Sequence, residues 1–166
     1  ISVASCTTTC LAPLAFAIHK NSKIEKGSMT TIHSYTTDQR LLDNSHKDLR
    51  RARSAPNAMV PTSTGAAKSL KMIIPELANK IDGISIRIPT PNVSLVQLSF
   101  NSIKKLTKEK INNSLLKASK TYLKKVLGVE QKPLVSSDFN HDPRSSIIDT
   151  GLTKVIGNNF ATVFAW

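Results

Sequence analysis

The sequence predicts an α+β fold, a two-layer α/β sandwich in which a mixed, largely antiparallel sheet carries helices on one face. Strand-like segments come in pairs joined by short links, which favours antiparallel neighbours. The helical segments inserted between them have one apolar side each, and that side must be buried against another layer. The 166 residues, 40% of them hydrophobic, are enough for one domain and too few for two ordinary ones.

The first two predicted elements carry a cysteine and a histidine. Residues 5–19 have apolar side chains at spacings of three and four, behind a run of Ser and Thr that can cap a helix. Cys6 lies in the first turn of this helix, and Cys10 lies one turn further in. Residues 27–35 are β-branched and rich in Thr, so we expect a strand with His33 near its end.

Residues 36–57 form a predicted loop, because they hold many charges and too little apolar periodicity for a buried element. Loops of this length in compact domains are usually functional. Gly65 then begins a predicted helix that ends before Pro75 and whose N-terminus suits an anion. A strand over residues 84–88 is expected to direct Arg87 to one face and to bury the residues that alternate with it: Ile84, Ile86 and Ile88.

Three more strands and one helix complete the prediction. One strand covers residues 93–100, and two short strands lie around residues 145–149 and 161–166. The helix over residues 107–123 is amphipathic, with its lysines outward. Its inward side is expected to hold four residues: Ile111, Leu115, Ala118 and Tyr122.

The composition narrows the range of partners. The formal net charge of +12 would attract polyanions, but aromatic residues that could stack on bases make up only 5% of the chain, so nucleic-acid binding is not expected as a primary role. The longest apolar run, residues 11–18, is far shorter than the roughly 20 residues of a membrane span, which argues against a membrane partner. The two cysteines lack partners for a zinc site, so no metal is expected. Reduced cysteines without a recognisable signal peptide favour a cytoplasmic protein.

Cys6 and His33 are the candidate catalytic residues. Unpaired N–H groups and the dipole at the start of a helix stabilise a thiolate, and a histidine at a strand end can supply the base that such a thiol needs. Each residue alone also has a structural interpretation, as a small buried side chain or as a hydrogen-bonding imidazole. We assign His19 and His141 to that structural class and His46 to hydrogen bonding within the loop.

A second group of residues suits negatively charged oxygens. It combines hydroxyl groups, guanidinium groups and a helix N-terminus, which are the groups that bind phosphate. Each of these residues, taken alone, can equally be a solvated charge or a helix cap. Beside a reactive thiol, they favour a phosphorylated ligand. The residues are Thr36, Arg51, Thr64, Gly65 and Arg87.

Six blocks of sequence carry a resemblance to a known family. Residues 4–13, ASCTTTCLAP, resemble the active-site signature ASCTTNCLAP of the glyceraldehyde-3-phosphate dehydrogenases. Five further blocks follow in the order of the family and spread the likeness over nearly the whole chain: MTTIH at 29–33, HKDLRR at 46–51, STGAAK at 63–68, RIPTPNV at 87–93 and SSDF at 136–139.

The resemblance implies the catalytic domain of a phosphorylating, NAD-dependent glyceraldehyde-3-phosphate dehydrogenase of glycolysis. This oxidoreductase converts glyceraldehyde 3-phosphate and inorganic phosphate to 1,3-bisphosphoglycerate. Cys6 matches the nucleophile that forms a hemithioacetal and then a thioester, and His33 matches the base that activates the thiol. The implied substrate-binding residues are Thr36 and Arg87 for the phosphate of the substrate, Ser5, Thr64 and Gly65 for the attacking phosphate, and in addition Thr7 and Arg51.

The resemblance also implies a larger protein. Residues 1–166 match the C-terminal catalytic domain, whereas the N-terminal NAD-binding Rossmann domain and the C-terminal helix of the family have no counterpart. The six glycines form no G-x-G-x-x-G, and the chain ends at Trp166, before the family's Tyr-Asp-Asn-Glu continuation. The fragment alone is expected to bind cofactor poorly and not to turn over. The full-length protein is expected to be a homotetramer, in which residues 35–57 match a loop near the cofactor at a subunit interface.

Two positions differ from, or vary within, the family pattern. Thr9 stands where the signature has Asn, so a hydrogen bond at the helix start near Cys6 is expected to change. Asn44 and Ser45 precede His46, where many NAD-specific members have Pro and photosynthetic NADP-accepting members have Ser. NAD is favoured and NADP is not excluded, because the main determinant of this choice is expected in the missing N-terminal domain, and no cofactor-binding residue is assigned.

Two alternatives stay open. Erythrose-4-phosphate dehydrogenase shares the Cys–His pair but lacks the Thr-Gly-Ala-Ala-Lys loop present here at residues 64–68. A non-catalytic, degenerate copy that binds nucleic acid or another partner would retain the basic charge and have an unreactive Cys6.

Overall fold

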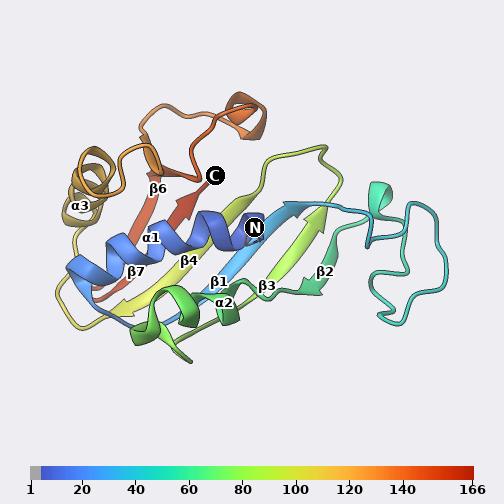
Figure 1. Cartoon of the computed structure of the whole chain (residues 1–166), viewed down its shortest axis with the longest axis horizontal. Coiled ribbons are helices and arrows are strands. Elements are labelled where there is room, and N and C mark those ends of the chain that lie inside the picture. Colours follow the sequence, from blue (N-terminus) through green and yellow to red (C-terminus); the bar gives the residue numbers. More distant parts are fainter. Residues whose placement is uncertain (1–4) are drawn as a thin grey trace.

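The computed structural model describes residues 5–166, so Ala4, the first residue of the signature block, lies outside the described residues. Seven strands form one sheet in the order β2-β3-β1-β4-β7-β6-β5, and three α-helices pack beside it (Figure 1). The elements are α1 (Cys6–Ser22), β1 (Ile24–Ser34), β2 (Val60–Ser63), α2 (Ala66–Ile73), β3 (Ile81–Ile88), β4 (Leu95–Ser102), α3 (Lys108–Lys120), β5 (Leu127–Glu130), β6 (Ser146–Ile156) and β7 (Phe160–Ala165).

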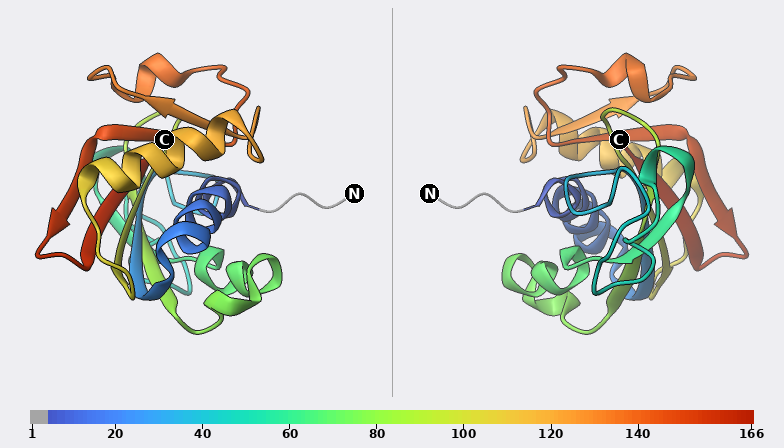
Figure 2. Two further views of the ribbon diagram at one scale, coloured as in Figure 1. Left: turned by 90° about the vertical axis from the view of Figure 1, so that its left-hand side faces the viewer. Right: turned by 90° about the vertical axis from the view of Figure 1, so that its right-hand side faces the viewer.

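The sheet is mixed and largely antiparallel. The neighbours β1 and β3 are parallel, as are β5 and β6, and the remaining neighbouring pairs are antiparallel. All three helices lie on one face of the sheet, with α1 between α2 and α3 (Figure 2). The predicted α+β, two-layer fold is therefore confirmed.

Helix α1 is the centre of the core. It begins at Cys6 because the Ser5 side chain caps it, the Ser5 Oγ accepting a hydrogen bond from the Thr8 backbone N–H at 3.2 Å. Its apolar side chains, among them the fully buried Leu11, Leu14 and Ile18, lie in the main core cluster. Burying each such side chain contributes about 1.5–3 kcal/mol, so the position of the first turn is fixed by the packing of the rest of the helix.

Strand β3 alternates as predicted, but its buried face is the opposite one. Ile84 is 50% exposed and Ser85 is buried, with Ile86 and Ile88 only partly buried. The expectation that the isoleucines point into the core is therefore wrong. The helices cover the face of Ser85 and Arg87, and no described element covers the apolar face. Apolar periodicity shows that a strand has two different faces, but it does not show which of them is covered by the helices of the same chain.

The end of α3 differs from the prediction, and two strands were not predicted. Ile111, Leu115 and Ala118 are buried as expected. Tyr122 lies beyond the end of the helix, is 41% exposed, and forms a T-shaped pair with the Phe16 ring. Its inward placement was wrong. Strands β2 and β5 have four residues each, too few for a clear period of two, which is why the sequence did not reveal them.

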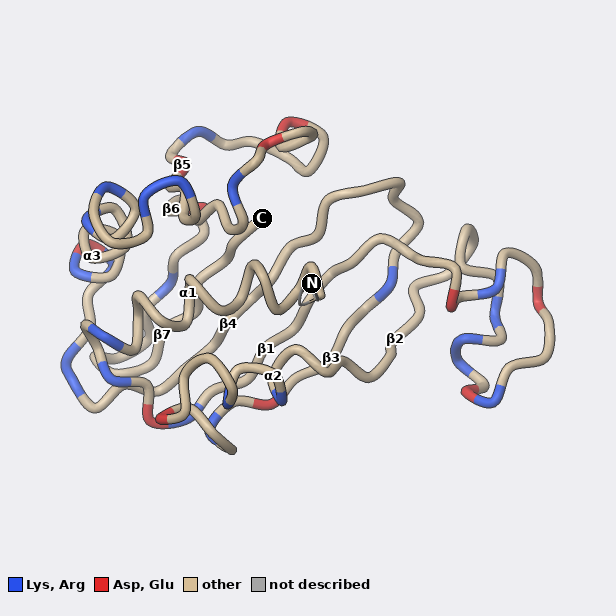
Figure 3. Tube along the Cα trace, in the orientation of Figure 1, with Lys and Arg blue, Asp and Glu red and all other residues tan. Residues whose placement is uncertain are grey.

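Charged residues are distributed unevenly over the surface. Lys and Arg gather at α3 and the turns near it and in the loop after β1, which extends beyond the sheet (Figure 3). In that loop the acidic residues pair with the basic ones: Asp38 with Arg51, and Asp43 with Arg53 at 3.3 Å. Across residues 5–166, none of the helices combines the length and apolar character that a membrane crossing requires.

Candidate active site

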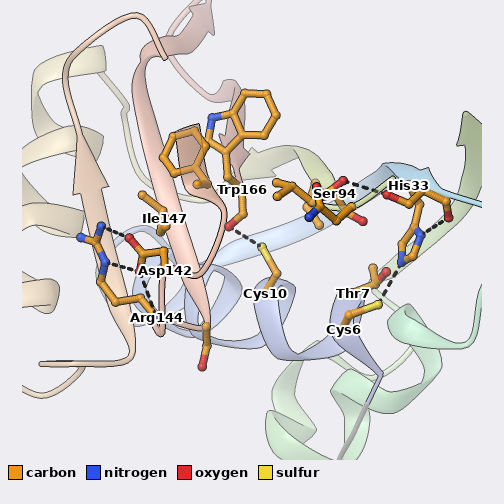
Figure 4. Close-up of a pocket in the computed structure, with 15 residues that line it drawn as sticks. Cys6, Thr7, Cys10, His33, Ser94, Asp142, Arg144, Ile147 and Trp166 are labelled. Atoms are coloured by element: carbon orange, nitrogen blue, oxygen red, sulfur yellow. Dashed lines mark hydrogen bonds and ion pairs between the residues drawn. The ribbon is translucent and has the colours of Figure 1, made fainter. Parts of the chain in front are cut away.

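Cys6 and His33 are in direct contact. The Cys6 Sγ lies 2.9 Å from the His33 Nε2 (Figure 4). The cysteine is the first residue of α1 and is exposed, and the histidine is the penultimate residue of β1 and is buried. The Ser5 cap and the end of β1 thus bring together a thiol and an imidazole that are 27 residues apart in the chain.

The environment of Cys6 favours its thiolate. The hydrogen bond with His33 is the main reason that the pKa of Cys6 falls from 9.0 to about 7. Partial burial opposes the shift, and the charge of His33 and hydrogen bonds with Thr7 add to it. About half of the Cys6 side chains are therefore ionised at neutral pH, the state that acts as a nucleophile.

Cys10 has the opposite environment. It is buried one turn further along α1, and burial raises its pKa to about 11. Its Sγ lies 3.6 Å from the Ser146 Oγ and 3.7 Å from the Ala165 carbonyl oxygen. Cys10 is therefore a packed thiol at the inner end of the cavity that Cys6 borders.

Arg87 contacts the other nitrogen of the His33 ring. The parallel pairing of β1 with β3 places His33 opposite Arg87. The Arg87 Nη1 lies 2.6 Å from the His33 Nδ1 and donates a hydrogen bond to the Ser34 carbonyl oxygen at 2.9 Å. The same carbonyl oxygen lies 2.6 Å from Nδ1. The Arg87 Nε is buried and has no partner among the described residues.

The second predicted guanidinium group, that of Arg51, lies close enough to Arg87 to act on it. Burial lowers the pKa of Arg87, the negative charge of Cys6 opposes this shift, and the positive charge of Arg51 adds to it. Arg51 itself pairs with Asp38 and with Asp48, the latter at 3.3 Å. Two cations therefore lie near each other, and one of them, Arg87, has no carboxylate partner among residues 5–166.

The other predicted anion-binding residues lie in separate elements. The Thr36 hydroxyl and backbone N–H both donate to the side-chain oxygen of Gln39. The Thr64 Oγ1 accepts a hydrogen bond from the Ala66 N–H at 3.2 Å, and Gly65 is the N-cap residue of α2. Within the described part of the chain, no hydrogen bond or ion pair joins Thr36, Thr64 or Gly65 to Cys6 or His33.

The remaining histidines and Thr9 have local roles. His19 is buried, and burial lowers its pKa. His46 accepts a hydrogen bond from the Asp48 N–H within the loop, and His141 is exposed with a φ of 63°. The Thr9 Oγ1 donates to the Ser5 carbonyl oxygen at 3.0 Å, so this threonine makes a hydrogen bond of its own at the helix start.

A cavity of about 310 Å³ lies beside Cys6, and most of its wall was not predicted (Figure 4). Trp166 stacks on Phe139, with ring centroids 5.3 Å apart, and Asp142 pairs with Arg144. Phe139 ends one of the blocks noted in the sequence, but no pattern marked the Asp142–Arg144 pair. Additional wall residues come from the β3–β4 link, from the start of β6 and from the last residue of the chain: Asn92, Val93, Ser94, Ser145, Ile147 and Trp166.

Val93 in this wall has an unusual backbone. Its φ is 62°, a left-handed conformation that costs a β-branched residue about 1–3 kcal/mol. The Ser34 Oγ donates a hydrogen bond to the Val93 carbonyl oxygen at 3.3 Å. The residue after His33 thus helps to hold the link between β3 and β4 in place beside the Cys6–His33 pair.

The chain is similar to known proteins over its whole length. Residues 5–166 match the family model described as glyceraldehyde 3-phosphate dehydrogenase, C-terminal domain. The chain is 51% identical over 166 residues to glyceraldehyde-3-phosphate dehydrogenase of Xanthobacter flavus, covering all of this chain and 50% of that protein. It is 51% identical over 168 residues to the enzyme of Borreliella burgdorferi, again covering 50% of the relative. A chloroplastic glyceraldehyde-3-phosphate dehydrogenase of Arabidopsis thaliana is 53% identical over 167 residues, with 37% of it covered.

The matches cover all of this chain but only part of each relative. The chain spans about half the length of the two bacterial relatives, although it is matched from end to end. The family model is the one for the C-terminal domain, and it includes the cysteine, the histidine and the arginine described above. The chain therefore belongs to the glyceraldehyde-3-phosphate dehydrogenase family and corresponds to its C-terminal domain.

Proposed function

We propose that the full-length protein oxidises glyceraldehyde 3-phosphate to 1,3-bisphosphoglycerate with NAD and inorganic phosphate, and that this chain is its catalytic domain. The observation that carries the proposal is the 2.9 Å contact between the Cys6 Sγ and the His33 Nε2. It provides an exposed thiolate and a proton carrier at the mouth of one cavity. The names of the relatives specify the substrate aldehyde, and the arginine beside the pair suits its phosphate.

The first step is addition of the thiolate to the aldehyde. The Cys6 sulfur forms a bond to the carbonyl carbon, and the carbonyl oxygen takes a proton from the His33 Nε2, which gives a hemithioacetal. NAD, when bound, would supply the acceptor for the hydride of this carbon. The His33 Nε2 would take the hydroxyl proton in this oxidation, which leaves the carbon as the carbonyl of a thioester on Cys6.

The second half of the proposed reaction releases the product. An oxygen of inorganic phosphate attacks the thioester carbonyl, the carbon–sulfur bond breaks, and Cys6 leaves as a thiolate. The depressed pKa of Cys6 makes it a good leaving group as well as a good nucleophile. The product is an acyl phosphate that keeps the original phosphate ester.

We assign the anion-binding residues to two sites. Arg87 and Thr36 would hold the phosphate of the substrate, and the unpartnered Arg87 Nε supports this role. The attacking phosphate would bind at the start of α1 and of α2, where backbone N–H groups point outward. That second site comprises Ser5, Thr7, Thr64 and Gly65, with Arg51 beside both sites.

The residues present fit the reactive end of the cofactor. The cavity beside Cys6 has room for a planar ring, and Val93, Ser94 and Trp166 form part of its wall. The rest of a dinucleotide needs a phosphate cradle, and the six glycines supply no G-x-G-x-x-G. A separate Rossmann domain in the full-length protein would hold it. NAD is our assignment, with NADP as the alternative. Over residues 5–166, no cluster of three or more His, Cys, Asp or Glu side chains is arranged to bind a metal ion.

Two surfaces support assembly into a homotetramer. On the sheet face opposite the helices, β3 presents Ile84, Ile86 and Ile88, of which Ile84 is half exposed, and exposed apolar side chains that lie together mark contact sites. The loop after β1 exposes Leu41, Leu42 and Leu49. We propose a cytoplasmic location, with a plastid as the alternative because one relative is chloroplastic.

Turnover by the full-length protein tests the proposal. We expect oxidation of glyceraldehyde 3-phosphate that depends on inorganic phosphate, and slower oxidation of erythrose 4-phosphate. Phosphate-independent turnover, or a preference for erythrose 4-phosphate, would favour the erythrose-4-phosphate dehydrogenase alternative. Slow, equal alkylation of Cys6 and Cys10 without any turnover would favour the degenerate copy.

A further inference from the structure

Gln39 is a buried amide that holds the chain just after β1. Only 2% of the residue is exposed. Its side-chain oxygen, Oε1, accepts two hydrogen bonds from Thr36, one from the backbone N–H at 2.9 Å and one from the hydroxyl at 3.1 Å. The Gln39 backbone N–H donates to the Thr36 carbonyl oxygen at 2.9 Å. Residues 36–39 thus form a tight turn that is closed by the backbone and again by the glutamine side chain.

The contact with the backbone fixes which way the Gln39 amide points. A backbone N–H can only donate, so the atom 2.9 Å from the Thr36 nitrogen must be the amide oxygen and not the amide nitrogen. The nitrogen, Nε2, is buried and has no partner among the described residues. A buried donor without an acceptor costs stability. Over residues 5–166, the favourable polar contacts of this side chain are therefore those of its oxygen.

The loop after β1 keeps Gln39 in place. The next residue, Arg40, donates its backbone N–H to the Arg51 carbonyl oxygen at 3.2 Å, and the Arg40 carbonyl oxygen accepts a hydrogen bond from the Ala55 N–H at 2.9 Å. The backbone that follows Gln39 is therefore tied to two later parts of the loop. Thr36, in contrast, is exposed. A buried side chain on a backbone held in this way is a firm support for the exposed residue that it contacts.

Thr36 follows the end of β1 at which the Cys6–His33 pair lies. His33 is paired with Arg87 across β1 and β3. One residue before Thr36, the Tyr35 backbone N–H donates to the carbonyl oxygen of Ile88, the last residue of β3, at 3.3 Å. The two strand ends are thus joined up to the residue before Thr36. Beyond that point, within the described part of the chain, the Gln39 oxygen is the group that accepts from the Thr36 N–H and hydroxyl.

We propose that Gln39 is a positioning residue for Thr36 and thereby contributes to the selectivity for a phosphorylated aldehyde. This inference rests on the proposed function, in which Thr36 and Arg87 hold the phosphate of the substrate. When the substrate binds, the Thr36 hydroxyl hydrogen turns from the Gln39 Oε1 to a phosphate oxygen, which is the stronger acceptor because it is charged. The Thr36 backbone N–H stays on Oε1. Thr36 therefore keeps its place while its hydroxyl changes partner, and no covalent bond changes.

The first half of the proposed reaction tests this without inorganic phosphate. With saturating NAD, the full-length protein should form NADH in a burst. The rate of the burst at low aldehyde concentration is measured with glyceraldehyde 3-phosphate and with D-glyceraldehyde, which has the same aldehyde and no phosphate. Gln39→Met keeps the approximate size of the side chain and removes the acceptor. It should react about tenfold more slowly with the phosphorylated aldehyde and within about twofold of the unaltered protein with D-glyceraldehyde.

Thr36→Val separates this inference from the proposed function. It removes the hydroxyl itself, so the phosphorylated aldehyde should react about 10–100-fold more slowly. Because Gln39 acts through Thr36, adding Gln39→Met to Thr36→Val should change this rate by less than about twofold. An unchanged rate in Thr36→Val would refute the assignment of Thr36 to the phosphate and this inference with it. If Thr36→Val slows the reaction and Gln39→Met does not, the inference about Gln39 is wrong and the proposed function is unaffected.

Ser54→Ala is the matched control in the same loop, because the Ser54 Oγ donates to the Leu41 carbonyl oxygen at 2.7 Å and not to the turn at residues 36–39. Both of its rates should stay within about twofold of the unaltered protein. Equal slowing of the two aldehydes in Gln39→Met would give Gln39 a structural role only and overturn the inference. If Gln39→Met does not fold, Gln39→Asn replaces it: its amide is one carbon shorter, which draws the oxygen away from Thr36, and the same selective loss is expected.

Discussion

The two cysteines of α1 are four residues apart and differ in every property that matters for reactivity. Cys6, in the first turn, is exposed and has a pKa of about 7, whereas Cys10, one turn on, is buried and has a pKa of about 11. The first has an imidazole as its partner, and the second has packed core and weak acceptors. The comparison teaches that partner and burial, rather than residue type or element, decide which thiol is a nucleophile.

The largest effect should come from removing the first thiol. We expect Cys6→Ser to lower the turnover of the full-length enzyme by on the order of 10³-fold or more, because the step that forms the carbon–sulfur bond is lost. Cys10→Ala is the control and should lose less than about tenfold, since it touches no reacting atom. Turnover assays of both purified variants give the answer; similar losses in the two would contradict the contrast.

Removing the imidazole should make Cys6 resemble an ordinary thiol. In His33→Asn the pKa of Cys6 is expected to return from about 7 toward 9.0. The thiolate fraction near neutral pH then falls roughly 50-fold, and alkylation by neutral iodoacetamide slows accordingly. His141→Asn is the control, because His141 is exposed and its positive φ suits Asn. An unchanged alkylation rate in His33→Asn would show that His33 is not the cause of the lowered pKa of Cys6.

The two thiols should change stability in opposite directions as the pH rises. Cys6 has a lower pKa in the folded than in the unfolded chain, so its contribution to stability is lost as the pH falls through 7 and is fully present above 9.0. Cys10 has a raised folded pKa, so its effect is absent below 9.0 and becomes a destabilisation as the pH approaches 11.

For Cys10 the destabilisation amounts to about 2 kcal/mol near pH ~10.5. Urea unfolding of the unaltered protein and of Cys10→Ala measures it. Between pH ~8 and ~10.5 the unaltered protein should lose about this much free energy of unfolding relative to Cys10→Ala, because only the unaltered protein has the buried thiol. A difference independent of pH would show that the second thiol is not desolvated.

The smallest effect concerns the helix cap. Ser5→Ala should cost about 1 kcal/mol of stability and should slow the alkylation of Cys6 a few-fold, because the cap fixes the first turn. Thr107→Ala removes the equivalent cap of α3, where the Thr107 side chain accepts from the Lys110 N–H, and should cost about the same stability without any effect on Cys6. Equal rates of Cys6 alkylation in Ser5→Ala and Thr107→Ala would show that the Ser5 cap does not affect the reactivity of the thiol.

The sequence predicted the elements better than their faces. The start of α1 and the end of β1 could be read from a Ser/Thr cap and a β-branched run, since both are local signals. The exposed side of Ile84 could not, because it depends on which face the helices cover. Tyr122 fitted the helical spacing but lies past the last turn, where α3 ends at Lys120.

The candidate site shows the same limit. Cys6, His33 and Arg87 stood out in the sequence by type and position, but the contact between the last two depends on the pairing of strands from distant parts of the chain. The Asp142–Arg144 pair and the positive φ of Val93 had no local signal. Both features result from tertiary packing, which the local propensities of the residues for helix or strand do not determine.

The parallel alignment of β1 with β3, which sets His33 against Arg87, has a consequence for the history of the chain. Adding or deleting one residue within either strand would turn the following side chains to the opposite face of the sheet and separate the imidazole from the guanidinium. Gains and losses of residues should therefore be confined to the connections, because the spacing inside the two strands is fixed.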